Sequence, residues 1–151
     1  MRGTFHDFPG LSNTLFICFF FRVPGGKPFL EKFCLKSTYA EMDVFTYMSQ
    51  TLNALNYLHT DQNLVHLDVK PENVILDSKS NSVKLIDFGC AQSLARIQNK
   101  MIGGSKPACS YESTEFLAPE LVKNAEDSGD GDVGTSTDMW AFAVLLYVAL
   151  R

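Results

Sequence analysis

Four polar side chains in this 151-residue chain have the types and spacing of a site for phosphoryl transfer. Asp68, Lys70 and Asn73 lie close together in sequence, and Asp87 follows 14 positions after Asn73. Phosphoryl transfer needs such a set. A carboxylate positions the attacking hydroxyl, a cation neutralises charge on the moving phosphoryl group, and an amide and a second carboxylate hold magnesium. The alternative is that these are ordinary polar residues in loops between short strands. The order of the two groups, Asp68 to Asn73 and then Asp87, and the spacing between them disfavour this alternative.

The elements that must position these residues can be read from hydrophobic patterns. Residues 14–23 are typical of a buried strand, and a helix is predicted from about Thr38 to His59, with one apolar stripe. Residues 74–76 and 83–86 indicate two short strands joined by a polar hairpin loop. The stripe consists of residues at spacings of three and four: Phe45, Met48, Leu52, Leu55 and Leu58.

The second half of the chain is predicted to contain two long loops and one helix. Residues 90–117 have no clear period, and residues 124–136 are rich in Asp, Glu, Gly and Ser. The last helix should begin near Asp138, with Ser136 or Thr137 as its cap. Because that helix is apolar on every side, we expect it to be buried at the hydrophobic centre, with Trp140 packed against the 38–59 helix.

Composition narrows the class of protein. The length fits one domain, and a hydrophobic fraction of 46% is typical of a packed core. A net charge of −4 argues against a nucleic-acid-binding face. The four cysteines form no C-x-x-C pair, which favours free thiols in a reducing compartment, the cytoplasm, over a disulfide or zinc framework.

No membrane association is expected from the two most apolar segments. The run Leu15–Phe21 has seven apolar residues after an acidic start, which favours a buried strand over the alternative of a signal-peptide core. The run Ala141–Leu150 is far shorter than the roughly 20 residues that a membrane-spanning helix requires.

The two motifs resemble the catalytic loop and the magnesium loop of eukaryotic protein kinases. They read His66-Leu67-Asp68-Val69-Lys70-Pro71-Glu72-Asn73 and Asp87-Phe88-Gly89. Ala118-Pro119-Glu120 and Asp138-Met139-Trp140 are similar to the family's A-P-E and D-x-W. Lys70, two positions after Asp68, is the serine/threonine form of the loop. The sequence looks closest to the calmodulin-dependent group of the myosin light-chain, death-associated, titin and obscurin kinases.

This resemblance implies a fold and a division of the chain. The fold class is α+β, the mainly helical large lobe of a protein-kinase-like fold, truncated at both ends. Residues 1–23 would be a partial small-lobe strand and hinge, and residues 24–151 a partial large lobe from its first helix to its central helix.

The resemblance also implies roles residue by residue. Asp68 would orient the substrate hydroxyl and accept its proton, Lys70 would sit against the transferring phosphate, and Ser113 takes the place of a threonine that bonds to both. The cofactors would be ATP and Mg²⁺. Asn73 and Asp87 would bind the metal, Ile75 would form the floor under adenine, and the backbone at Val23 would face its edge.

Two departures from the family pattern matter. The arginine before the catalytic aspartate is Leu67 here, and a leucine cannot pair with a phosphorylated activation loop. Upstream of His66 there is no G-x-G-x-x-G loop and no V-A-I-K lysine, the parts that cover and clamp the ATP phosphates. The isolated chain is therefore expected to be inactive.

Two functions remain open at this point. The first is a serine/threonine kinase that transfers the ATP γ-phosphate to protein hydroxyls in a complete parent protein, with calmodulin-like or cytoskeletal regulators outside this chain. The second is a non-catalytic kinase-like scaffold or binding module. The four retained polar residues favour the first, and the missing phosphate clamp favours the second.

Overall fold

The structure is a computed structural model that describes residues 26–29, 41–77, 80–98, 114–126 and 133–151. The predicted strand at 14–23, the predicted helix start at 38–40 and the site residues Val23 and Ser113 lie outside the described residues. In chain order the elements are β1 (Lys27–Pro28), α1 (Glu41–Thr60), β2 (Leu64–Val65), β3 (Val74–Asp77), β4 (Ser82–Leu85), β5 (Gln92–Ser93), α2 (Leu94–Gln98), α3 (Pro119–Glu126) and α4 (Thr135–Ala149).

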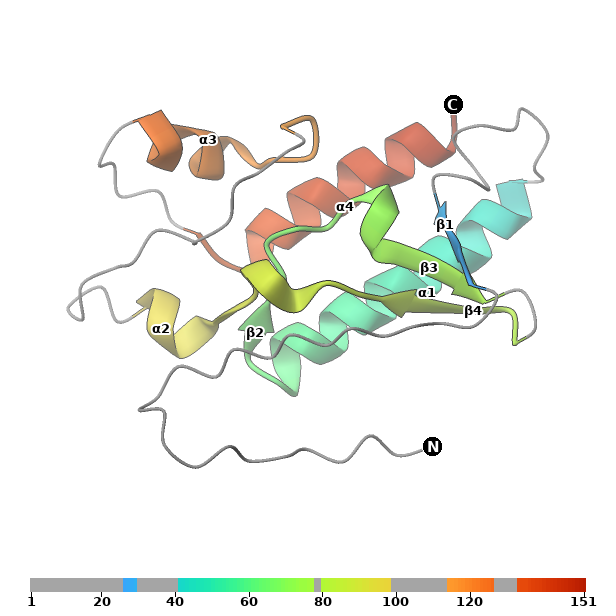
Figure 1. The fold of residues 1–151 in the computed structure, drawn as a ribbon, viewed down its shortest axis with the longest axis horizontal. Coiled ribbons are helices and arrows are strands. Elements are labelled where there is room, and N and C mark those ends of the chain that lie inside the picture. The colour runs from blue at the N-terminus through green and yellow to red at the C-terminus, as the bar shows by residue number, and fades with distance from the viewer. Residues whose placement is uncertain (1–25, 30–40, 78–79, 99–113, 127–132) are drawn as a thin grey trace.

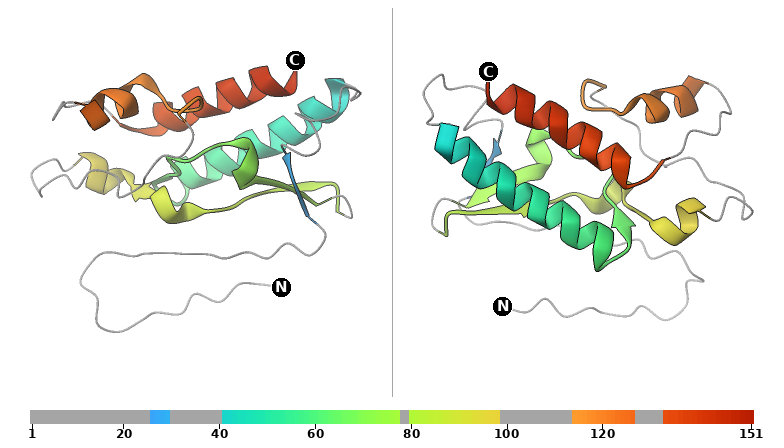
Figure 2. Two further views of the ribbon diagram at one scale, coloured as in Figure 1. Left: turned by 45° about the horizontal axis from the view of Figure 1, so that its top comes forward. Right: turned by 180° about the vertical axis from the view of Figure 1, so that it is seen from behind.

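Helices α1 and α4 lie side by side, and the β3–β4 hairpin also packs against α1 (Figures 1 and 2). The hydrophobic core forms between these three elements, from residues such as Leu55 of α1, Leu76 of β3 and Leu145 of α4. This arrangement agrees with the predicted α+β class.

Helix α1 ends at Thr60, one residue after the predicted end, and its buried face was predicted only in part. Met48, Leu55 and Leu58 are buried as expected, whereas Phe45 is 67% exposed and Leu52 is 39% exposed. The observed stripe passes through Thr51, which is fully buried because its hydroxyl donates to the carbonyl of Tyr47, four residues earlier, at 2.9 Å. A threonine whose hydroxyl is hydrogen-bonded to a carbonyl of its own helix can face the core. A search for apolar residues alone does not detect such a position.

The predicted hairpin is confirmed. Strands β3 and β4 pair antiparallel, with Val74 opposite Leu85 and Asp77 opposite Ser82. At its tip, Asn81 accepts a hydrogen bond from the Tyr47 hydroxyl through Oδ1, at 2.7 Å. Gln50 donates to the carbonyl of Asn81 and accepts from the Val83 amide, at 3.1 and 2.9 Å. Side chains of α1 therefore fix the outer end of the hairpin.

Helix α4 begins at Thr135, three residues before the predicted start, and only one of its faces is buried. Ala141, Phe142 and Leu145 pack into the core, but Trp140 is 48% exposed. The expectation that Trp140 forms the hydrophobic centre is therefore wrong. A helix that is apolar all round has no periodicity to show which face packs, and within the described residues α1 covers only one side of it.

Three further expectations need correction. The 90–117 region contains β5 and α2, and β5 pairs antiparallel with β2. Helix α3 extends to Glu126, into the stretch predicted as a loop from residue 124. Cys90 is disulfide-bonded, so the expectation of free thiols is wrong at that position. Among the described residues, no helix is long and apolar enough to cross a membrane.

Candidate active site

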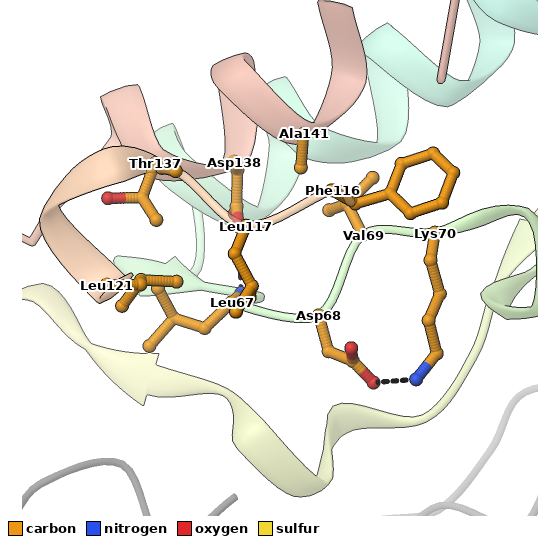
Figure 3. Close-up of a pocket in the computed structure, with 11 residues that line it drawn as sticks. Leu67, Asp68, Val69, Lys70, Phe116, Leu117, Leu121, Thr137, Asp138 and Ala141 are labelled. Atoms are coloured by element: carbon orange, nitrogen blue, oxygen red, sulfur yellow. Dashed lines mark hydrogen bonds and ion pairs between the residues drawn. The ribbon is translucent and has the colours of Figure 1, made fainter. Parts of the chain in front are cut away.

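The catalytic-loop residues form one hydrogen-bonded group around the carboxylate of Asp68. The Asn73 side-chain amide donates to both the carbonyl and Oδ2 of Asp68, at 2.8 and 2.9 Å. The Lys70 ammonium lies 2.9 Å from the same Oδ2 (Figure 3). Two donors therefore converge on Oδ2, whereas no donor among the described residues bonds to Oδ1.

His66 connects this group to the segment that carries Asp87. Its Nε2 lies 3.1 Å from the carbonyl of Ile86, and its Nδ1 lies 3.3 Å from the Asp68 amide. Since that amide donates, Nδ1 accepts, and the proton of the neutral ring sits on Nε2. Burial lowers the pKa of His66, which favours this neutral form. A second bond, from the Ile86 amide to the Asn73 carbonyl at 2.9 Å, joins the same two segments.

Asp87 is held in a conformation that presents its carboxylate to solvent. The residue is exposed and has a left-handed backbone with φ of 61°. Its Oδ1 accepts a hydrogen bond from the Gly89 amide at 3.2 Å. A Cβ at position 89 would lie 3.1 Å from that oxygen, so a glycine lets the turn close around the carboxylate.

Asn73 and Asp87 offer the oxygen donors that a hard cation prefers. The side-chain nitrogen of Asn73 donates its hydrogen bonds to Asp68, so the side-chain oxygen of Asn73 points away from Asp68. Within the described ranges, no group of three or more His, Cys, Asp or Glu side chains could hold a metal by itself. One carboxylate and one amide suit Mg²⁺ bound together with substrate phosphates.

Asp138, at the start of α4, anchors the catalytic loop. Its side chain is almost fully buried and accepts the amides of His66 and Leu67, at 2.7 and 2.8 Å. His59, near the end of α1, lies 2.8 Å from the same carboxylate. Leu67 has a left-handed backbone, with φ of 64°. The sequence indicates Asp138 only as part of a motif and near a helix start, because its loop partners lie more than 70 residues away in the chain.

A small pocket lies between the catalytic loop and the segment that precedes α3 (Figure 3). One wall is formed by residues 67–70 and the other by residues 116–118 with Leu121, while Thr137, Asp138 and Ala141 of α4 close it. Leu67 is buried there, beside Leu117 and Leu121. Asp68 therefore lies at the edge of this small pocket, with its carboxylate turned toward Lys70.

Comparison with known proteins agrees with this geometry. The family model described as "Protein kinase domain" matches residues 5–151. The chain belongs to the protein kinase domain family. It is 39% identical over 130 residues to the Titin homolog of Caenorhabditis elegans, covering 85% of this chain and 1% of that protein.

Two death-associated kinases show the same degree of similarity. The chain is 35% identical over 131 residues to Death-associated protein kinase dapk-1 of Caenorhabditis elegans, covering 85% of the chain and 8% of that protein. It is 35% identical over 132 residues to Death-associated protein kinase 2 of Mus musculus, covering 85% of the chain and 31% of that protein. The predicted membership of the titin and death-associated type of serine/threonine kinases is confirmed. The chain spans less than a third of the length of each of these relatives.

The remaining predicted site residue is Ile75, in the centre of β3. It is 9% exposed, and it alternates along the strand with Val74 and Leu76, which both belong to the main core. Its side chain therefore points to the opposite face of the hairpin. A role under adenine stays a prediction, as do those of Val23 and Ser113, which lie outside the described residues.

A literal glycine-rich run does occur in this kinase domain, but it lies after the catalytic motifs. Residues 129–134 read Gly-Asp-Gly-Asp-Val-Gly, which fits the spacing G-x-G-x-x-G. It contains two aspartates, whose charge would repel phosphates, and it precedes α4 rather than a lysine-bearing strand. Protein kinases in general use ATP and Mg²⁺, and this run does not supply the missing phosphate cover.

Proposed function

We propose that the protein containing this chain is a serine/threonine kinase, which transfers the γ-phosphate of ATP to serine or threonine hydroxyls of a protein substrate. The observation that carries the proposal is the bonding of Asp68. Its Oδ2 is held by Asn73 and Lys70, and no donor in the described part of the chain bonds to its Oδ1. A carboxylate fixed in this way can receive a hydroxyl and its proton without reorganising.

The roles of the neighbouring residues follow from their contacts. Lys70 stays beside Asp68 as a cation that can approach the phosphoryl group during transfer. Mg²⁺, when bound, would neutralise phosphate charge, and Asn73 and Asp87 would hold it. The hydrogen bonds of His66 and Ile86 keep Asp68 and Asp87 on one connected frame.

Leu67 argues against one mode of kinase regulation, the binding of a phosphorylated residue next to Asp68. The side chain is 3% exposed and lies among apolar residues, so it has neither the charge nor the access to bind a phosphate. We therefore propose that the active arrangement does not depend on a phosphorylated residue bound at this position.

The second candidate is a non-catalytic kinase-like module. It is favoured by the absence of a phosphate-covering loop and lysine upstream of His66. The two functions differ in what they require of the metal site, because a scaffold has no need for nucleotide there.

Nucleotide binding provides the first test. Mn²⁺, a paramagnetic substitute for Mg²⁺, is added with ATP to isotopically labelled chain, and amide signals are followed by NMR. The kinase proposal predicts selective broadening at Asn73, Asp87 and Gly89, and its loss in Asp87→Ala. Equal spectra for the wild type and Asp87→Ala would favour the scaffold.

Phosphate transfer provides the second test. Casein and radiolabelled ATP are incubated with the protein at the full length in which it is expressed. We expect transfer that both Asp68→Asn and Asp87→Ala abolish, and its absence would refute the enzyme. The 151-residue chain alone should give no transfer above the Asp87→Ala control, because the sequence upstream of His66 lacks the glycine-rich loop and the V-A-I-K lysine that clamp the ATP phosphates.

Regulation and location are further parts of the proposal. As the resemblance to the calmodulin-dependent group implies, we propose a cytoplasmic kinase with calmodulin-like or cytoskeletal regulators that act outside this chain. Co-purification with calmodulin in calcium and in chelator, and cell fractionation, test these two statements separately.

A further inference from the structure

Two neighbouring side chains in the first turn of α4 hold the two walls of the pocket. Asp138 binds the catalytic-loop wall through the amides of His66 and Leu67. Thr137 is 2% exposed, and its hydroxyl donates to Oε1 of Glu120, in the first turn of α3, at 2.7 Å. The spacing between the walls is therefore set from one point on one helix.

The hydroxyl of Thr137 both accepts and donates a hydrogen bond. Its oxygen accepts the Gly134 amide at 3.1 Å, while its single hydrogen is donated to Glu120. A hydrogen bond to a carboxylate is stronger than a neutral one. Among the residues that the structure describes, no cation lies within ion-pair distance of Glu120, so Thr137 is the group that fixes this carboxylate there.

Glu120 in turn is linked by backbone hydrogen bonds of its neighbours to the pocket wall at residues 116–118. The amides of Leu121 and Val122 both donate to the carbonyl of Ala118, at 2.9 and 3.3 Å, and the Leu117 amide donates to Thr114, at 3.1 Å. These turns join Glu120 to residues 116–118, which line the pocket opposite Asp68. A shift of Glu120 would therefore move that wall.

We infer that Thr137 is a positioning residue for the protein substrate. By holding Glu120, it sets the distance of the wall at residues 116–118 from the catalytic carboxylate of Asp68. The statement about substrate rests on the proposed kinase function, whereas the statement about the wall does not.

The wall is tested by amide hydrogen exchange on the folded chain. Thr137→Val keeps the shape of the side chain and removes the hydroxyl, and Glu120→Met removes the acceptor while leaving the cap of α4 intact. Each should speed exchange at Leu117, Leu121 and Val122 about tenfold, the usual scale for one charge-assisted hydrogen bond. The double variant should show no further increase. Thr137→Ser should stay within about twofold of the wild type, as should the control Thr135→Val, from the same helical turn.

Two results would overturn the inference at this level. One is that Thr137→Val behaves like Thr135→Val. The other is that Thr137→Val speeds exchange but Glu120→Met does not, because the hydroxyl would then act only as a cap of α4. If Thr137→Val fails to fold, Glu120→Met and Thr137→Ser decide between these outcomes.

The substrate part is tested by steady-state kinetics on the full-length protein. The KM for casein should rise about tenfold in Glu120→Met and in Thr137→Val, with the KM for ATP unchanged. Equal increases in both KM values would mean a general structural role and refute substrate positioning. Absence of any transfer by the wild type would refute the kinase function, and the exchange experiment would still decide the role of Thr137 in placing the wall.

Discussion

Replacing Asp138 by asparagine should destabilise the fold and release the catalytic loop. The buried carboxylate accepts two backbone amides, of His66 and Leu67, and lies 2.8 Å from the ring of His59. Asparagine retains one acceptor oxygen and places an NH₂ group where the other stood. At least one amide then faces a donor, and the charge that strengthens the remaining bonds is lost.

The size of the effect can be worked out from these contacts. One hydrogen bond to a charged acceptor contributes about 1.5–3 kcal/mol, and weakening of the second bond adds to this. We expect Asp138→Asn to lower the free energy of unfolding by about 3 kcal/mol. For a chain of this length, that corresponds to a fall in Tm of about 6–12 °C. Leu67, no longer held in its left-handed conformation, should relax and displace Asp68.

Urea unfolding followed by far-UV circular dichroism measures this difference. The control is Asp61→Asn, the same chemical change at an exposed position just after α1, which should alter the free energy of unfolding by less than about 0.5 kcal/mol. If Asp138→Asn unfolds at the same urea concentration as the control, the anchoring of the catalytic loop by Asp138 is wrong.

Two further predictions concern pH and the single tryptophan. Burial lowers the pKa of His66 in the folded chain, so the unfolded chain binds the extra proton first as pH falls. The stability that is present above 6.5, the pKa of an unfolded histidine, should therefore be lost as pH falls through the folded pKa. The free energy of unfolding should change by at most about 1.4 kcal/mol per pH unit. Urea midpoints at several pH values between 7.5 and 5 should show this slope, and His66→Gln should reduce it; an unchanged slope would contradict the assignment. Trp140 is the only tryptophan and is half exposed, so acrylamide should quench the fluorescence of the folded chain readily. Trp140→Ala should lower the free energy of unfolding by less than about 1 kcal/mol. A decrease near the roughly 3–5 kcal/mol of a buried aromatic residue would show that α4 is covered on that face.

The local chemistry of the sequence was sufficient to predict the hairpin and the grouping of Asp68, Lys70 and Asn73. Asp68, Lys70 and Asn73 lie within one short loop, so their proximity follows from chain connectivity, and the strands on either side of the 78–81 loop are close enough in sequence to pair with each other. The kinase resemblance rested on the same local motifs and was confirmed by the family comparison.

Burial was harder to predict, because a helix face is selected by what packs against it. Helix α4 is apolar throughout, so its sequence could not show that Phe142 faces the core while Trp140 faces outward. In α1 the buried stripe includes Thr51, whose polarity is masked by a bond to its own helix.

Only the tertiary structure revealed the contacts that hold the site together. Asp138 reaches the catalytic loop, and Thr137 reaches Glu120, across 71 and 17 positions of the chain respectively. Neither pairing leaves a periodic or spacing signal, since it depends on how α4 crosses the loop and the start of α3. The sequence by itself therefore determined which chemical groups are present, and the packing of α4 decided how they are held in position.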